Sequence, residues 1–353
     1  MTDRHPATVG HGTSASDACS VLWQQDGTSA YGTAARAGFF VVLEQPGPWG
    51  RKAAEESHLP RDVGIELDRL ASAAGGRFML MRRPGPHVDR PGGQHVLVGH
   101  AGGSRAEAWL LEGRVASPAD LVGLDWAALA EGRVEAVAAT LPGAGLSPPV
   151  LLICTNGRRD VCCAVRGRPL AAAAAHLDPT RVWEVSHTGG HRFAPTAVLL
   201  PWGQAFARLT EDTTAQLLRS SLTNAIPLDL LGPHHDRGRS ALAPALQAAE
   251  SFVRHLVGET DLPAFTTEAV PDTEAWTGRR ADSAPADSAP ADGESAGGAP
   301  TADDGSVSHA WVRHADGREW RVRVVRKALG RQRPESCGKA PVEVHEYEVA
   351  LTG

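Results

Sequence analysis

Short apolar runs bounded by polar, glycine or proline residues recur through the first 260 positions. The clearest is FFVVLE at 39–44, and VLLI at 150–153 has the same character. Such runs are too short for typical helices and are typical of buried strands. On this basis we predict strands over 39–44, 77–82, 95–100, 106–111, 150–153, 182–186 and 196–200.

Between these runs, apolar residues recur at helical spacing or alanine dominates. Helices are predicted over 61–74, 121–130, 131–140, 170–177, 211–224 and 243–257. Strands interleaved with helices predict an α/β fold. The segment 18–145 shows a mixture of strands and helices similar to that of 146–260, so we expect it to be a second α/β half.

The pattern changes after residue 277. Residues 277–306 contain repeated ADSAP and almost no large apolar side chain, which predicts a flexible acidic linker. Residues 307–353 then alternate polar and apolar positions around Asp316–Gly317, which predicts a hairpin in a small β-rich domain. We expect assembly of any site in the core to be independent of this domain, so that a chain ending near Thr277 keeps the site. Residues 1–17 are polar and are predicted to be disordered.

Composition and charge exclude several classes of protein. The net charge of −6 argues against general nucleic-acid binding. No apolar run approaches the roughly 20 residues of a membrane-spanning helix, and the N-terminus has no signal-peptide pattern. The five cysteines do not resemble a secreted disulfide framework, since three of them are clustered. We therefore expect a cytoplasmic protein without membrane or nucleic-acid partners.

The segment 149–203 carries the candidate chemistry. Cys154, Cys162 and Cys163 lie in its first part, and His187 and His191 flank Gly189–Gly190 in its second. The predicted β-α-β order puts both groups at strand ends, where they could meet at one edge of the sheet. Two thiolates and two imidazoles suit zinc or a [2Fe–2S] cluster. Adjacent cysteines are often only buried apolar residues, but the paired glycines and the upstream loop favour a metal centre.

Three motifs carry a family resemblance. CTNGRRDVCC, then HTGGHRFAPTAVLLPWG, preceded by LEQPGPWGRKA at 43–53, resemble the motifs of the sucrase/ferredoxin-like family. The resemblance implies a thioredoxin-like ferredoxin domain over 146–260 that holds a [2Fe–2S] cluster. By position, the implied ligands are Cys154, Cys163, His187 and His191. Asn156 stands where the family usually has histidine, so we do not expect a ligand there.

The resulting expectation is an electron carrier rather than a stand-alone catalyst, with an unidentified redox protein as its partner. Two alternatives remain open: a thioredoxin-like thiol oxidoreductase using the cysteines, and a structural Cys2His2 zinc module that mediates protein contacts. Within the cysteine loop, Asp160 is predicted to have a structural role. Trp49 is predicted to pack on the sheet. Cys337 is far in the sequence from the other candidate ligands and is predicted to be structural.

Overall fold

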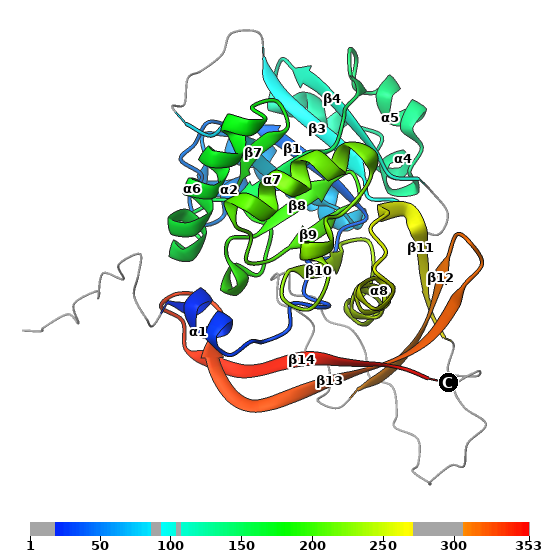
Figure 1. Ribbon diagram of the computed structural model, residues 1–353. Coiled ribbons are helices and arrows are strands. Elements are labelled where there is room, and N and C mark those ends of the chain that lie inside the picture. The colour runs from blue at the N-terminus through cyan, green and yellow to red at the C-terminus, as the bar shows by residue number, and fades with distance from the viewer. Residues whose placement is uncertain (1–17, 86–92, 104–106, 271–305, 353) are drawn as a thin grey trace, which may run out of the picture.

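A computed structural model describes residues 18–85, 93–103, 107–270 and 306–352. It contains a ten-stranded sheet in the order β10-β9-β8-β6-β7-β2-β1-β3-β4-β5 and a four-stranded antiparallel sheet, β11-β12-β13-β14 (Figure 1). The α/β prediction is therefore confirmed. The predicted disorder of 1–17, and the predicted linker up to residue 305, lie outside the described residues. None of the described helices has the length and apolar character needed to cross a membrane.

The first half of the large sheet follows the predicted strands closely. Its strands are β1 (Phe39–Glu44), β2 (Arg77–Arg82), β3 (Gln94–His100), β4 (Trp109–Val115) and β5 (Gly145–Leu146). The accompanying helices are α1 (Cys19–Gln25), α2 (Ala53–Glu56), α3 (Arg61–Ala73), the 3-10 helix η1 (Pro118–Gly123), α4 (Trp126–Glu131) and α5 (Val134–Ala139). The two helices predicted over 121–140 are shorter than expected, because Asp125 caps α4 and Gly132, with φ +77°, ends it.

The second half contains β6 to β10 and three helices. Its strands are β6 (Val150–Cys154), β7 (Val182–Val185), β8 (Ala197–Leu200), β9 (Gln204–Phe206) and β10 (Asp236–Arg239). Its helices are α6 (Val161–Leu177), α7 (Glu211–Ser220) and α8 (Pro244–Val257), with short 3-10 turns η2 (His191–Phe193), η3 (Ser221–Thr223), η4 (Leu228–Leu230) and η5 (Leu262–Ala264).

The two halves share one strand order. In the first, β1 is parallel to β2 and antiparallel to β3, which pairs with β4. In the second, β6 is parallel to β7 and antiparallel to β8, which pairs with β9. The halves join where β2 and β7 pair antiparallel, with Met81 opposite Val185. The similarity expected from the mixture of elements is thus present in the topology.

Side chains alternate across the sheet because successive strand residues face opposite sides. On β1, Phe39, Val41 and Leu43 join a core that includes Leu67 of α3. On β6, Leu151 and Ile153 join a separate core beneath α6 and α7. The opposite faces of both halves contribute to one shared core, whose members include Val42, Met81, Leu152, Trp183 and Val198.

The C-terminal sheet spans the lower side of the molecule in Figure 1. Its strands are β11 (Phe265–Ala269), β12 (Val307–His314), β13 (Glu319–Pro334) and β14 (Pro341–Leu351). The predicted turn at Asp316–Gly317 links β12 and β13, and Gly317 has φ +94°. Strand β11 precedes the predicted linker and pairs with β12, so the sheet takes one strand from the preceding part of the chain.

This sheet buries apolar residues against the core. Val312 and Val322 lie with Ala248 and Val253 of α8. At the other end of the sheet, Val344 lies with Trp23 and Phe193. The C-terminal sheet is therefore packed against the preceding part of the chain; whether a chain ending near Thr277 keeps the site stays a prediction.

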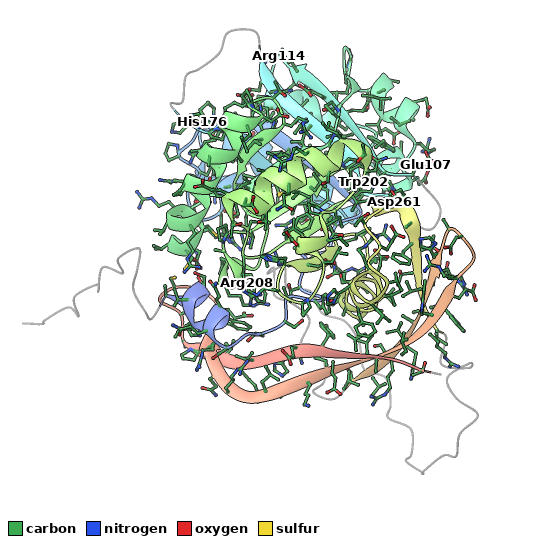
Figure 2. All side chains as sticks on the ribbon, in the orientation of Figure 1. Glu107, Arg114, His176, Trp202, Arg208 and Asp261 are labelled. Atoms are coloured by element: carbon green, nitrogen blue, oxygen red, sulfur yellow. The ribbon has the colours of Figure 1, made fainter. Side chains whose placement is uncertain are left out.

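The N-terminal helix is attached to both sheets. Trp23 Nε1 donates to the Pro334 carbonyl at 3.0 Å. Arg208, labelled beside α1 in Figure 2, donates to the carbonyls of Thr28 at 2.8 Å and His234 at 2.7 Å. Helix α1 is therefore held between the end of β13 and the loop that leads to β10.

Candidate metal centre

Two loops at one edge of the large sheet carry the predicted ligands. Cys154 is the last residue of β6, and it lies opposite Val185, the last residue of the parallel strand β7. His187 follows β7 after one residue, and His191 begins η2. Because parallel strands end at the same edge, the loops after β6 and β7 open together.

Helix α6 begins earlier than predicted. It starts at Val161, not at residue 170, because the Asp160 side chain accepts a hydrogen bond from the Cys162 N–H at 2.8 Å and caps the helix. The alanine-rich run identified only its second part. Cys162 and Cys163 therefore lie in the first helical turn. Consecutive helical residues are rotated by about 100°, so their side chains face different surroundings.

The structure brings the predicted ligand residues together. The sulfur of Cys154 lies beside Cys163, the His187 ring and the backbone of Thr188. The rings of His187 and His191 have centroids 5.9 Å apart. Both cysteines are 1% exposed, whereas both imidazoles are half-buried. The group thus has a buried thiol side and a more accessible imidazole side.

Protonation in this group is uneven. The hydrogen bond from Cys163 holds the pKa of Cys154 well below its usual value, with a smaller contribution from His187. The same contact, together with burial, raises the pKa of Cys163. Burial lowers the pKa of His187 to about 4. His187 is therefore neutral at neutral pH. Metal ligation requires deprotonated thiols, so binding of a metal by both sulfurs would release a proton from this pair.

Two observations indicate that a metal group fits here. The Nδ1 atoms of His187 and His191 are buried without a hydrogen-bond partner. Unpartnered buried ring nitrogens beside two thiols are unfavourable unless something binds them. Cations also surround the site: Arg77 donates to the His187 carbonyl at 3.1 Å, and buried Arg237 donates to the Gly189 carbonyl at 3.0 Å. These positive charges suit a group that contains thiolates.

Arg237 also accounts for the paired glycines. Gly189 and Gly190 have φ of +78° and +67°, and a Cβ on Gly190 would collide with the guanidinium of Arg237. Burial lowers the pKa of Arg237 to about 9, which leaves the guanidinium charged at neutral pH. The sequence indicated close backbone approach at these glycines, but not that its partner comes from β10.

Asn156 and Trp49 have structural positions. Asn156 is buried and donates to the Gly50 carbonyl at 2.9 Å, while its side-chain oxygen accepts from the Arg158 N–H. Trp49 is buried and donates to the Gln45 carbonyl at 2.7 Å. The packed position predicted for Trp49 is therefore present, and its loop is tied to the cysteine loop.

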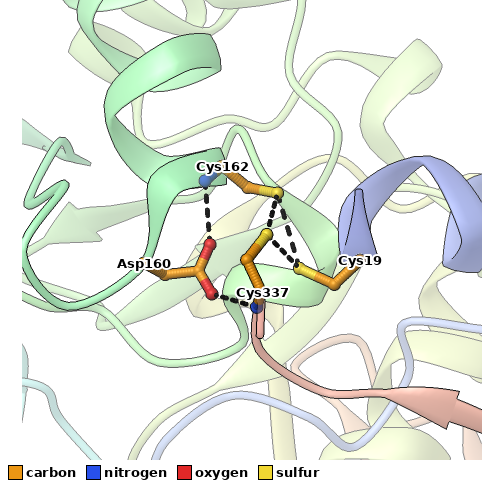
Figure 3. Close-up of side chains that lie close together, drawn as sticks. All are labelled: Cys19, Asp160, Cys162 and Cys337. Carbon is orange, nitrogen blue, oxygen red and sulfur yellow. Dashed lines mark hydrogen bonds between the residues drawn. The ribbon is translucent and has the colours of Figure 1, made fainter. Parts of the chain in front are cut away.

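Cys162 faces a second group of thiols. Its sulfur lies 3.1 Å from that of Cys337 and 3.4 Å from that of Cys19, and the last two are 3.5 Å apart (Figure 3). Cys337 is far from Cys162 in the sequence, but the folded chain brings the two sulfurs together. Cys19 and Cys337 lie near opposite ends of the chain, so no local spacing identifies them.

Asp160 lies between the two groups. One carboxylate oxygen accepts from Ser336 Oγ at 2.8 Å and from the Cys337 N–H at 2.9 Å. The same oxygen is 3.9 Å from His191 Nε2. The structural role predicted for Asp160 is confirmed: it caps α6 and holds the loop that carries Cys337.

Comparison with known proteins supports the family resemblance. No curated protein and no solved structure matches the chain. The family described as sucrase/ferredoxin-like matches residues 30–231, which is more than half of the 353 residues. The match includes strands β1 to β9 of the large sheet and all four predicted ligands, but not β10, Cys19 or Cys337. The chain belongs to the sucrase/ferredoxin-like family.

Proposed function

We propose that the chain is an electron-transfer protein in which Cys154, Cys163, His187 and His191 hold a [2Fe–2S] cluster. The observation that carries the proposal is the convergence of two buried thiols in contact with each other and two imidazoles with unpartnered Nδ1 atoms. Such a cluster, when bound, accepts and releases one electron. The chain's own residues supply the ligands, exclude water from the thiol side and set the local charge.

We also infer that the second half is a thioredoxin-like ferredoxin domain. Strands β6 and β7 are parallel and linked by α6, and β8 and β9 follow as antiparallel neighbours on the other side of β6. This arrangement supports the fold that the family implies. It would place the cysteine and histidine loops at the carboxyl ends of the two parallel strands, a common position for ligand sites.

The surrounding charge favours easy reduction. Only two of the four ligands are thiolates, so the site carries less negative charge than a four-cysteine site. Arg77 and Arg237 add positive charge within a largely buried region. An added electron would therefore be stabilised by nearby cations.

The partner side should be the histidine side. The His191 side chain is 17% exposed, whereas Cys154 and Cys163 are almost completely buried. Electron transfer needs close approach of a partner rather than a substrate cavity. We propose that an unidentified redox protein docks over the loop 187–192.

Anaerobic purification of the full chain tests the proposal. We expect a red-brown protein with about two irons and two acid-labile sulfides at this site, and an EPR signal on one-electron reduction. His187→Ala should lose the iron, whereas the matched control His176→Ala, on the exposed surface of α6, should retain it. A colourless protein in which zinc depends on His187 would instead establish a zinc module. A metal-free protein with a reversible dithiol would favour the oxidoreductase alternative.

A further inference from the structure

The second thiol group combines three segments that are far apart in the sequence. Cys19 begins α1, Cys162 lies in the first turn of α6, and Cys337 lies in the loop between β13 and β14. The three sulfurs form a closed triangle with sides of 3.1, 3.4 and 3.5 Å. A carboxylate oxygen of Asp160 lies within 4.8 Å of all three sulfurs.

Backbone groups support this triangle. Asp160 accepts from the N–H groups of Cys162 and Cys337, one on each oxygen. It also accepts from Ser336 Oγ at 2.8 Å. The carboxylate thus fixes the backbone that carries two of the three cysteines. Hydrogen bonds that hold the residues around a ligand set are typical of metal sites.

We propose that Cys19, Cys162 and Cys337 form a second metal site that binds zinc. Three converging thiols are a soft ligand set, and zinc prefers such a set. In a tetrahedral site with zinc–sulfur bonds of about 2.3 Å, neighbouring sulfurs are about 3.8 Å apart. The observed triangle needs only a small expansion to reach that size. The fourth position faces Asp160, which either binds directly or orients a bound water.

A metal explains the triangle better than a disulfide. A disulfide joins two sulfurs at about 2.05 Å and would leave the third thiol without a role. Here all three sulfur–sulfur distances lie between 3.1 and 3.5 Å, so each cysteine contacts both others. Cys19 and Cys162 are buried, but Cys337 is only partly so, which leaves a path by which an ion can enter.

The proposed zinc would fasten both chain ends to the start of α6. Arg333 pairs with Asp26 at 2.9 Å, and Arg192 pairs with Glu335 at 2.9 Å, so ion pairs already bring these segments together. Zinc would add bonds that persist when such half-exposed pairs are screened by salt. The site is therefore structural, and it is distinct from the proposed redox centre.

Elemental analysis of the full chain tests the proposal. Zinc and iron are measured in the native protein and in the Cys19→Ser and Cys337→Ser variants, all purified from cells grown with added zinc. We expect the native chain to hold about one more zinc than either variant, with iron unchanged, because neither residue contacts the predicted cluster ligands. Circular dichroism verifies folding, and Cys337→Ala provides a second substitution at the half-buried position.

Several outcomes would overturn the zinc assignment. Equal zinc content in the native chain and all three variants would do so. Alkylation in denaturant with chelator should detect five free thiols, and three would indicate a disulfide instead. Loss of iron together with zinc in folded Cys337→Ser protein would show that the three thiols belong to the redox centre. Because iron and zinc are counted separately, failure of the zinc site does not depend on the cluster proposal.

Discussion

The two sulfur groups at the start of α6 differ in how the chain assembles them. The predicted ligands Cys154, Cys163, His187 and His191 come from two neighbouring loops of one β-α-β unit. Cys19, Cys162 and Cys337 come from both ends of the described chain and its middle. A site built from neighbouring loops can be predicted from the spacing of its residues in the sequence. A site built from distant segments can be identified only in the folded chain.

Cys162 and Cys163 are adjacent in the sequence but belong to different sulfur groups. Cys163 contacts Cys154, and Cys162 contacts Cys19 and Cys337. The rotation between successive helical residues aims them in different directions once Asp160 has fixed the start of the helix. Two neighbouring thiols therefore need not be alternatives for one ligand position.

Replacement of Cys162 or Cys163 by serine should have the largest effect, because each residue belongs to only one of the two groups. Cys163→Ser should lose most of the iron and keep the zinc. Cys162→Ser should lose the zinc and keep the iron. Iron, sulfide and zinc are measured per chain, and each variant is the matched control for the other. Loss of iron from the Cys162 variant alone would reverse the assignment made from the family position.

Removal of the C-terminal strands should also affect the two sulfur groups differently. A chain ending at Thr277 loses Cys337 and three fully buried valines, Val312, Val322 and Val344. Burial of these side chains contributes roughly 5 kcal/mol, so we expect much lower thermal stability. Zinc should be absent, while folded protein should retain iron. A chain that lacks only residues 280–300 is the control, and equal melting temperatures would contradict the packing argument.

Replacement of a histidine should change the potential without removing the cluster. His187→Cys and His191→Cys should each lower the midpoint potential, because a thiolate adds negative charge. In the native chain, reduction raises the proton affinity of an imidazole ligand. The potential should therefore fall as pH rises above the pKa of the oxidised form, by at most about 59 mV per pH unit.

Redox titrations followed by EPR at several pH values measure this effect. The slope should flatten in the two variants, and His176→Cys, on the exposed part of α6, is the control. A native potential that is constant from mildly acidic to strongly alkaline pH, and equal in both variants, would rule out histidine ligation.

Removal of a nearby cation should have the smallest effect. Arg77→Gln keeps a donor for the His187 carbonyl but removes a positive charge beside Cys154. We expect the potential to fall on the order of tens of millivolts, with unchanged iron content. Arg69→Gln, on the exposed face of α3, should leave the potential unchanged. An increase in the Arg77 variant would contradict the charge argument.

Local sequence patterns were sufficient to predict most strands of the large sheet. The strands at 39–44 and 77–82 occur where predicted, because each is a short apolar run buried on both faces. The start of α6 was missed because CCAVRG has little helical signature of its own, and the cap at Asp160 determines it. The pairing of β2 with β7 joins two half-sheets, and no local pattern encodes it.

Some residues of the candidate site could likewise be predicted from local patterns, and others could not. The convergence of Cys154, Cys163, His187 and His191 could be predicted, because two motifs bring these residues to one sheet edge. Arg237, from β10, could not be predicted, although it fills the space beside Gly190. Cys19 and Cys337 are 318 positions apart, and only the folded chain makes them neighbours.

The antiparallel seam between β2 and β7 makes the large sheet resemble a dimer whose subunits share one chain. Each half would otherwise expose an edge strand, which is prone to pair with other molecules. At this seam, Arg77 of the first half donates a hydrogen bond to the backbone carbonyl of His187 in the second half. The first half thus contacts the proposed metal centre as a neighbouring subunit would, and substitutions there would adjust the centre without altering any proposed ligand.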